Sequence, residues 1–138
     1  MLGLILLYLQ RKKKPQPVIV PKAVISPYEE AMKQLEQLQS DKPGAKQYHS
    51  KLTDIFRLYI FRKKGILSLQ KTTDDLIIQL KSLILTKEQF DKLSQSLRLS
   101  DFVKFAKYIS TNEDDKLAFE EIKNAIITIE KTEAKAPL

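Results

Sequence analysis

The sequence has no cysteine, no tryptophan, one histidine and three glycines in 138 residues. Without cysteine the chain has no disulfide, thiolate metal ligand or thiol nucleophile. The single histidine, His49, excludes metal sites built from two or three imidazoles, and the isolated glycines exclude a glycine-rich phosphate-binding loop. Because polar residues surround His49, we expect it on the surface. We therefore expect no catalytic activity, no cofactor, no metal and no small-molecule substrate.

The net charge of +7 is concentrated at one end of the chain. Residues 1–25 contain five basic side chains and no acidic one, whereas residues 26–138 contain 19 basic and 17 acidic side chains. A domain that binds nucleic acid usually has a basic surface of its own. We therefore expect no nucleic acid partner. A basic helical nucleic-acid-binding protein is the alternative hypothesis.

Residues 1–14 combine an apolar run with a basic cluster. Met1–Leu9 is uncharged, and it is followed almost at once by the basic side chains Arg11, Lys12, Lys13 and Lys14. A helix of this length reaches about 14 Å, which is too short to cross a hydrocarbon core of about 30 Å. Two hypotheses fit: the inner part of a transmembrane helix that begins upstream, with Tyr8 at the interface, or a short anchor on the membrane surface. In a third, this segment packs on the domain.

A proline-rich segment over residues 15–25 follows the basic cluster. Pro15, Pro17 and Pro21 predict an extended, semi-rigid spacer, which argues against an N-terminal segment packed on the domain. A basic cluster directly after an apolar segment is typical of the cytoplasmic flank of a membrane protein. We therefore expect attachment to the inner membrane through residues 1–14, with the rest of the chain on the cytoplasmic side.

Residues 26–131 show the pattern of a helical domain, and residues 132–138 are expected to fray. Apolar residues recur at helical spacing, and no stretch shows the sustained alternation of a strand. Ser26-Pro27 opens a first helix that ends near Ser40. Residues 45–64 form the best amphipathic helix, which Gly65 ends.

The second half of the domain has four further helix starts. Thr72 or Thr73 opens a helix with two acidic residues in its first turn, and a capping box over residues 86–89 opens the next. Ser100-Asp101 predicts a new short helix that buries Phe102, Phe105 and Ile109, and Asn112 caps the last helix. The sequence thus predicts an all-α fold, a compact bundle of about five to six short helices preceded by the apolar segment and the spacer.

Three segments, in this order, resemble the cytoplasmic helical domain of the Bat (aerotolerance) proteins: Tyr48–Ile60, Thr72–Leu76 and Asp101–Lys107. The resemblance is closest to the C-terminal part of BatD and to related small membrane proteins of unknown function, and it covers about residues 26–130. This chain departs from the family after Ile60. The family tends to continue there with an acidic residue and then Arg-Phe-Gly, where this chain has residues 61–65, FRKKG.

The resemblance implies a transmembrane helix directly before the domain. It also implies two kinds of protein partner, a MoxR-type AAA+ ATPase and von Willebrand factor A-domain membrane proteins. The associated role is assembly or chaperone-like regulation at the envelope, including stress tolerance, without enzymatic activity. We therefore expect a non-enzymatic, membrane-anchored adaptor.

The residues predicted to bind a partner are polar: Asp54, Arg57, Asp101, Lys104 and Lys107. The spacing of Asp54 and Arg57 allows the two to pair on one helix face, and Lys104 and Lys107 lie one turn apart beside Tyr108. In one alternative these residues staple the second helix to the Asp101–Lys107 segment. In another, Lys104 and Lys107 form an ordinary solvated face.

Overall fold

The computed structural model describes residues 25–135, in which all regular structure is helical. The five α-helices of this range are α2 (Pro27–Asp41), α3 (Ala45–Lys64), α4 (Thr73–Leu80), α5 (Lys87–Phe105) and α6 (Asn112–Lys135). A short 3-10 helix, η2 (Ser68–Gln70), lies between α3 and α4. The predicted all-α class is confirmed.

The predicted anchor and its basic flank, including Tyr8 and residues 11–14, lie outside the described residues, as does the spacer up to residue 24. Between residues 25 and 135, no helix has both the length and the hydropathy needed to cross a membrane. At the other end of the domain, α6 continues to Lys135, past residue 131, where we expect the domain to end.

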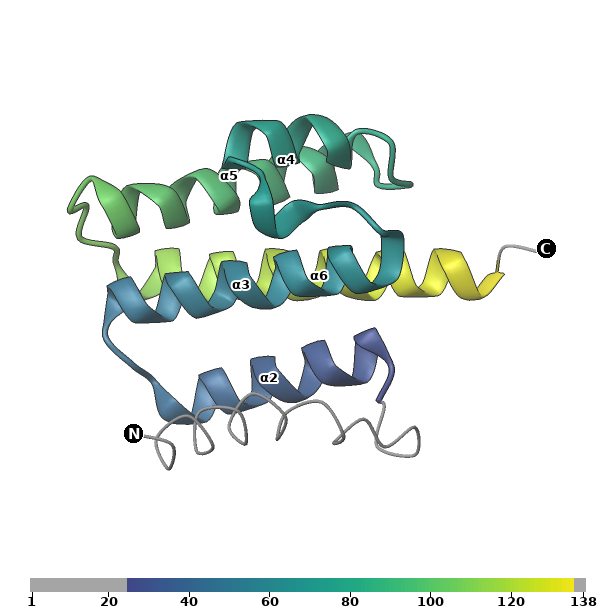
Figure 1. Cartoon of the computed structure of the whole chain (residues 1–138). Coiled ribbons are helices and arrows are strands. Elements are labelled where there is room, and N and C mark those ends of the chain that lie inside the picture. The colour runs from purple at the N-terminus through teal and green to yellow at the C-terminus, as the bar shows by residue number, and fades with distance from the viewer. Residues whose placement is uncertain (1–24, 136–138) are drawn as a thin grey trace, which may run out of the picture.

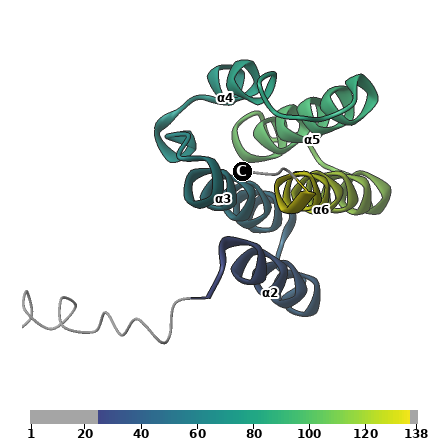
Figure 2. The ribbon, with the colours of Figure 1, turned by 90° about the vertical axis from the view of Figure 1, so that its right-hand side faces the viewer.

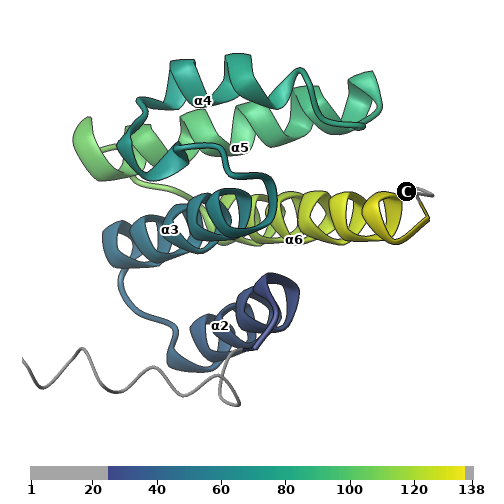
Figure 3. The ribbon, with the colours of Figure 1, turned by 45° about the vertical axis from the view of Figure 1, so that its right-hand side comes forward.

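The helices form three layers (Figure 1). Figure 2 shows α3 and α6 side by side in the middle layer, with α2 on one side and α4 and α5 on the other; Figure 3 gives the same arrangement. Because α3 packs against α2, α5 and α6, it is covered on several sides. Its predicted apolar stripe is buried accordingly, at Leu52, Phe56, Tyr59 and Ile60.

Most helix ends follow the capping signals in the sequence. The Ser26 hydroxyl accepts the N–H of Glu29 at 3.1 Å, and Gly65 ends α3 with a φ of 71°, which glycine adopts without steric cost. Thr86 and Gln89 form the predicted capping box. The last helix differs by one residue, because Thr111 and not Asn112 provides the capping hydroxyl, which accepts the N–H of Asp114 at 3.0 Å.

The fifth short helix predicted from Ser100-Asp101 does not exist as a separate element, because α5 runs without a break from Lys87 to Phe105. The physical reason is the partner of the Ser100 hydroxyl. A serine that caps a helix bonds to a backbone N–H of its own first turn, but the Ser100 hydroxyl bonds to His49 on α3. Ser100 therefore joins two helices and starts none.

Candidate partner-binding surface

The five residues predicted to bind a partner lie on two helices. Asp54 and Arg57 are in the middle of α3, and Asp101, Lys104 and Lys107 are at the C-terminal end of α5 or just after it. Asp54 is exposed and lines a groove of about 290 Å³ between α2 and α3. The cross-helix hydrogen bond between α3 and this part of α5 comes from Ser100. Among the described residues, no ion pair or side-chain hydrogen bond joins the two groups.

Arg57 has an internal role. Its Nη1 donates to the backbone carbonyls of Ser68 and Lys71, both at 2.5 Å, and its Nη2 donates to the Thr73 hydroxyl at 3.3 Å. In return, the Ser68 hydroxyl donates to the Arg57 carbonyl at 2.5 Å. The guanidinium thus holds the connector that leads from α3 into α4. The spacing of Asp54 and Arg57 allows a pair, but the donors of Arg57 point to this connector.

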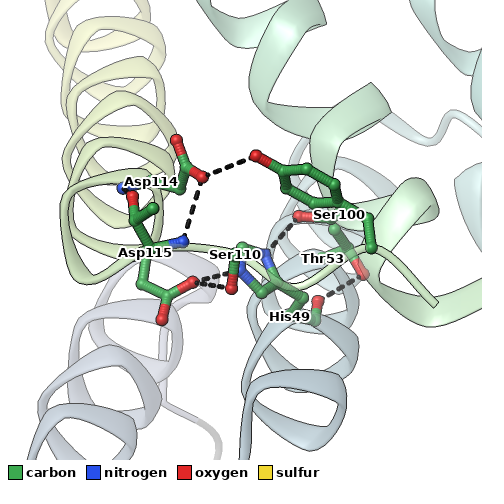
Figure 4. Close-up of polar contacts among 8 residues, drawn as sticks. His49, Thr53, Ser100, Ser110, Asp114 and Asp115 are labelled. Carbon is green, nitrogen blue, oxygen red and sulfur yellow. Dashed lines mark hydrogen bonds and ion pairs between the residues drawn. The ribbon is translucent and has the colours of Figure 1, made fainter.

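His49 is buried, with no exposed surface, so the prediction of a surface histidine is wrong. Its Nδ1 lies 2.9 Å from the Ser100 hydroxyl on α5, and its Nε2 lies 2.6 Å from Asp115 Oδ1 on α6 (Figure 4). The ring therefore bridges three helices. His49 belongs to the buried stripe of α3, since Leu52, Thr53 and Phe56 follow it at helical spacing.

Ser100, His49 and Asp115 are the residue types of a serine hydrolase triad, in hydrogen-bonding contact. Such a triad acts only if a substrate carbonyl can approach the hydroxyl to about 3–3.5 Å. Ser100 is 0 % exposed, so its hydroxyl faces the packed interior. The cluster is thus built to hold helices together, and it offers no place for a substrate.

The side of α5 that faces away from the bundle carries large apolar side chains in solvent. Phe102 is 58 % exposed, Phe105 is 75 % exposed and, just after the helix, Ile109 is 87 % exposed. The expectation that all three are buried is wrong. The face of α5 that is buried includes Leu93, Leu97, Ser100 and Val103, and this register turns the two phenylalanines outward.

Three more side chains of this segment are the half-buried Lys104 and the exposed Lys107 and Tyr108. The Lys104 ammonium lies 5.1 Å from the centroid of the Phe105 ring, a cation–π distance. We call Phe102, Lys104, Phe105, Lys107, Tyr108 and Ile109 together the α5-end surface. Five grooves of the domain are lined by other residues.

The loop over residues 106–111 is fixed in place despite its exposure. Lys107 has a φ of 57°, and the N–H groups of Ala106 and Tyr108 both donate to the Phe102 carbonyl, at 3.0 and 3.2 Å. The Tyr108 hydroxyl donates to Asp114 Oδ2 at 3.1 Å, and the Ser110 hydroxyl donates to Asp115 Oδ1 at 2.7 Å. The loop therefore presents Ile109 from a defined backbone.

Hydrogen bonds and burial shift the pKa values of three groups beside this loop. The backbone N–H of Thr111 is the main cause that lowers the pKa of Asp114, and the Asp114 carboxylate raises the pKa of Tyr108. Burial, with a further contribution from the charge of Asp115, raises the pKa of Tyr48 to about 12. The carboxylates of Asp114 and Asp115 thus both accept hydrogen bonds from other groups of the domain.

The rest of the described surface offers no site for a metal. No cluster of three or more acidic or histidine side chains that could bind a metal ion occurs within residues 25–135. A groove of about 680 Å³ lies beside Asp115, lined in part by Tyr48, Lys116 and Phe119, but it is open and its charges are of both signs. The α5-end surface is therefore the candidate with the clearest physical signal.

The chain matches no protein-family model, no curated protein and no solved structure. The resemblance to the Bat proteins therefore stays a prediction. The function has to be argued from the residues of the domain.

Proposed function

We propose that this protein is a non-enzymatic adaptor, anchored to the inner membrane through residues 1–14, whose cytoplasmic helical domain binds a protein partner through the α5-end surface. The exposure of Phe102, Phe105 and Ile109 is the observation that supports binding. Contiguous large apolar side chains on a soluble domain mark an interaction site, because leaving them in water is unfavourable. Aromatic side chains are also the usual anchors of protein interfaces.

The place of this surface on the bundle favours a protein partner over a lipid. The chain enters the described domain at the start of α2, and the C-terminal end of α5 lies at the opposite end of the bundle (Figure 1). The two ends are separated by roughly the length of α3, about 30 Å for a helix of its size. An anchor at residues 1–14 would tether the domain through the spacer at the entry end, opposite to the α5-end surface.

A second copy of the chain fits this surface less well. Two copies that pair about a twofold axis place the same patch on both sides of the interface. Lys104 and Lys107 of one copy would then lie near the same lysines of the other copy, and like charges repel. A different protein has no such restriction.

The resemblance to the Bat proteins supports a more specific form of the proposal. It names a MoxR-type AAA+ ATPase and von Willebrand factor A-domain membrane proteins as the partners, and an envelope process as the role. The residues that we expect to contact them are the members of the predicted set at the end of α5, Asp101, Lys104 and Lys107, together with Phe102, Phe105 and Ile109. Arg57 is expected to act indirectly, through the fold.

The experiment compares two variants at apolar positions of equal fractional exposure. Phe102 on α5 and Ile78 on α4 are both 58 % exposed. Full-length chains with Phe102→Ser or Ile78→Ser are tested against the purified ATPase and A-domain proteins of the same genome. We expect Phe102→Ser to lower affinity at least tenfold and Ile78→Ser to leave it unchanged. Lys104→Ala and Lys107→Ala should weaken binding with little change in stability.

Three results would contradict the proposal. Equal binding by the two serine variants would show that the α5-end surface is not the contact. Recovery of the full-length protein from the soluble fraction, without affinity for lipid vesicles, would contradict the anchor. Concentration-dependent dimerisation that Phe102→Ser abolishes would indicate a second copy as the occupant.

A further inference from the structure

The loop between α5 and α6 presents Ile109, the most exposed apolar side chain of the α5-end surface at 87 %. The hydroxyls of Tyr108 and Ser110 bond this loop to two carboxylates of α6. Asp114 accepts from the Tyr108 hydroxyl and from the Thr111 N–H, and both lie within a few residues of it. Asp115 accepts from the Ser110 hydroxyl at 2.7 Å.

Asp115 also connects the loop to the buried centre of the bundle. The oxygen that accepts from Ser110, Oδ1, lies 2.6 Å from His49 Nε2, and His49 Nδ1 lies 2.9 Å from the Ser100 hydroxyl. A continuous path of hydrogen bonds therefore leads from Ser110 through Asp115 and His49 to Ser100 (Figure 4). It joins the loop, α6, α3 and α5.

The chemistry of the three groups allows the path in both protonation forms of His49. An ionised carboxylate only accepts, so Asp115 requires a hydrogen on His49 Nε2. Neutral His49 then accepts at Nδ1 from the Ser100 hydroxyl. If His49 gains a proton, Nδ1 donates and the Ser100 hydroxyl turns to accept. The path stays closed in both forms, so His49 holds Asp115 in place whichever form is present.

We propose that Asp115, oriented by His49, is a positioning residue for the α5-end surface: through Ser110 it holds the loop in the conformation that presents Ile109 to the partner. This inference rests on the proposed function, because it assigns a role in the same binding event. A loop that is ordered before binding loses less conformational entropy when the partner arrives. The hydroxyl of Ser110 therefore contributes to affinity without touching the partner.

Two serines at opposite ends of the path provide a matched pair of variants. Ser110→Ala removes the bond between Asp115 and the loop, whereas Ser100→Ala removes the bond at the buried end and leaves Ser110 on Asp115. Each variant loses one hydroxyl from the same cluster. Ser100 is fully buried and Ser110 is only partly so, and we therefore expect Ser100→Ala to lower the stability at least as much.

The measurements are hydrogen exchange of the backbone amides of residues 108–111 and affinity for the purified MoxR-type ATPase, both on the full chain. In Ser110→Ala we expect exchange at these amides to accelerate several-fold and affinity to fall about fivefold, as for one lost hydrogen bond. In Ser100→Ala, loop exchange and affinity should stay within twofold of the wild type. Ser110→Thr keeps a hydroxyl and should restore most of the binding.

The inference is overturned if Ser110→Ala leaves loop exchange unchanged, or if the two alanine variants change loop exchange and affinity alike. The latter result would mean that the cluster only stabilises the fold. Failure of the proposed function looks different, since Phe105→Ser would then bind the ATPase as the wild type does. If Phe105→Ser abolishes binding and Ser110→Ala has no effect, the surface is correct and the positioning role is wrong.

Discussion

Two regions lie next to each other at one end of the bundle and distribute their side chains in opposite ways. The first encloses the polar residues His49 and Ser100, whose polar atoms bond to each other and to Asp115. The second leaves Phe102, Phe105 and Ile109 in solvent. Ser100 is 0 % exposed and Phe102, two positions later, is 58 % exposed. Helix register, not residue type, decides which side chains are inside.

The comparison also separates two roles. Every buried side-chain nitrogen or oxygen of the described residues has a hydrogen-bond partner, so the enclosed region is complete within the domain. The exposed apolar side chains, in contrast, are not covered by other residues of the domain. Substitutions in the first region should change stability, and substitutions in the second should change binding.

The largest effect is expected for His49→Leu. The substitution removes the donor to Asp115 and the partner of Ser100, and a broken buried network costs about 3 kcal/mol of unfolding free energy. Urea denaturation measures this loss. Gln47→Leu, at an exposed position two residues earlier on α3, is the control and should change the stability by no more than about 0.5 kcal/mol. Similar losses in the two variants would contradict the enclosed role of His49.

A smaller loss is expected for Arg57→Lys. The lysine keeps the charge but cannot reproduce a planar fork that reaches Ser68, Lys71 and Thr73 together, and the lost bonds to buried acceptors should lower the unfolding free energy by about 2 kcal/mol. Urea midpoints again provide the measurement, and Asp54→Asn on the same helix should leave them almost unchanged. If Arg57→Lys is neutral instead, Arg57 is free for the partner role that we first predicted.

Neighbouring positions on α5 should then respond in opposite ways. Val103 is 5 % exposed, and Val103→Ser should lower the unfolding free energy by about 2 kcal/mol through lost packing and a buried hydroxyl. Phe102→Ser should change it less, by no more than about 1 kcal/mol, since more than half of the side chain already lies in water. Thermal unfolding monitored by circular dichroism tests both. A large loss for Phe102→Ser would place its ring in the core and remove the evidence for a binding surface.

The smallest effect concerns Asp114. Its pKa lies below the ordinary value of 3.8, mainly because of the Thr111 N–H and also because of the Tyr108 hydroxyl. A lowered pKa in the folded state stabilises the fold above the ordinary value, and this contribution is lost as the pH falls through the folded value. Tyr108→Phe should raise the pKa of Asp114 only part of the way. An NMR titration of the carboxyl carbon measures it, and an unchanged pKa would argue against the Tyr108–Asp114 bond.

Much of the fold is predictable from the sequence because it depends on local signals. The bounds of α3 follow from an apolar stripe at helical spacing and from Gly65, and the starts of α2, α4 and α5 follow from Ser26, Thr72 and Thr86. These signals need only a few adjacent residues. Nothing in them requires knowledge of which helices are neighbours.

The candidate site was less predictable, because it depends on contacts between distant residues. The sequence around Ser100 predicts a helix N-cap. Ser100 is not one because its hydroxyl bonds to His49 on the adjacent helix. The burial of His49 had a signal in its spacing to Leu52 and Phe56, and the exposure of Phe102 had one in the register of Leu93, Leu97 and Val103. For both residues, the polarity of the side chain suggests one location, inside or outside, and the helical spacing indicates the other.

The central claim is that a protein partner covers the α5-end surface. Photo-crosslinking in cells tests it most directly, with p-benzoylphenylalanine in place of Phe105, which is 75 % exposed on α5, or of Phe61, which is 39 % exposed on α3. We predict a crosslink from position 105, and none from position 61, to a MoxR-type ATPase or a von Willebrand factor A-domain membrane protein identified by mass spectrometry. The account is contradicted if position 105 crosslinks to lipid or to a second copy and to no other protein. It is also contradicted if both positions give the same products.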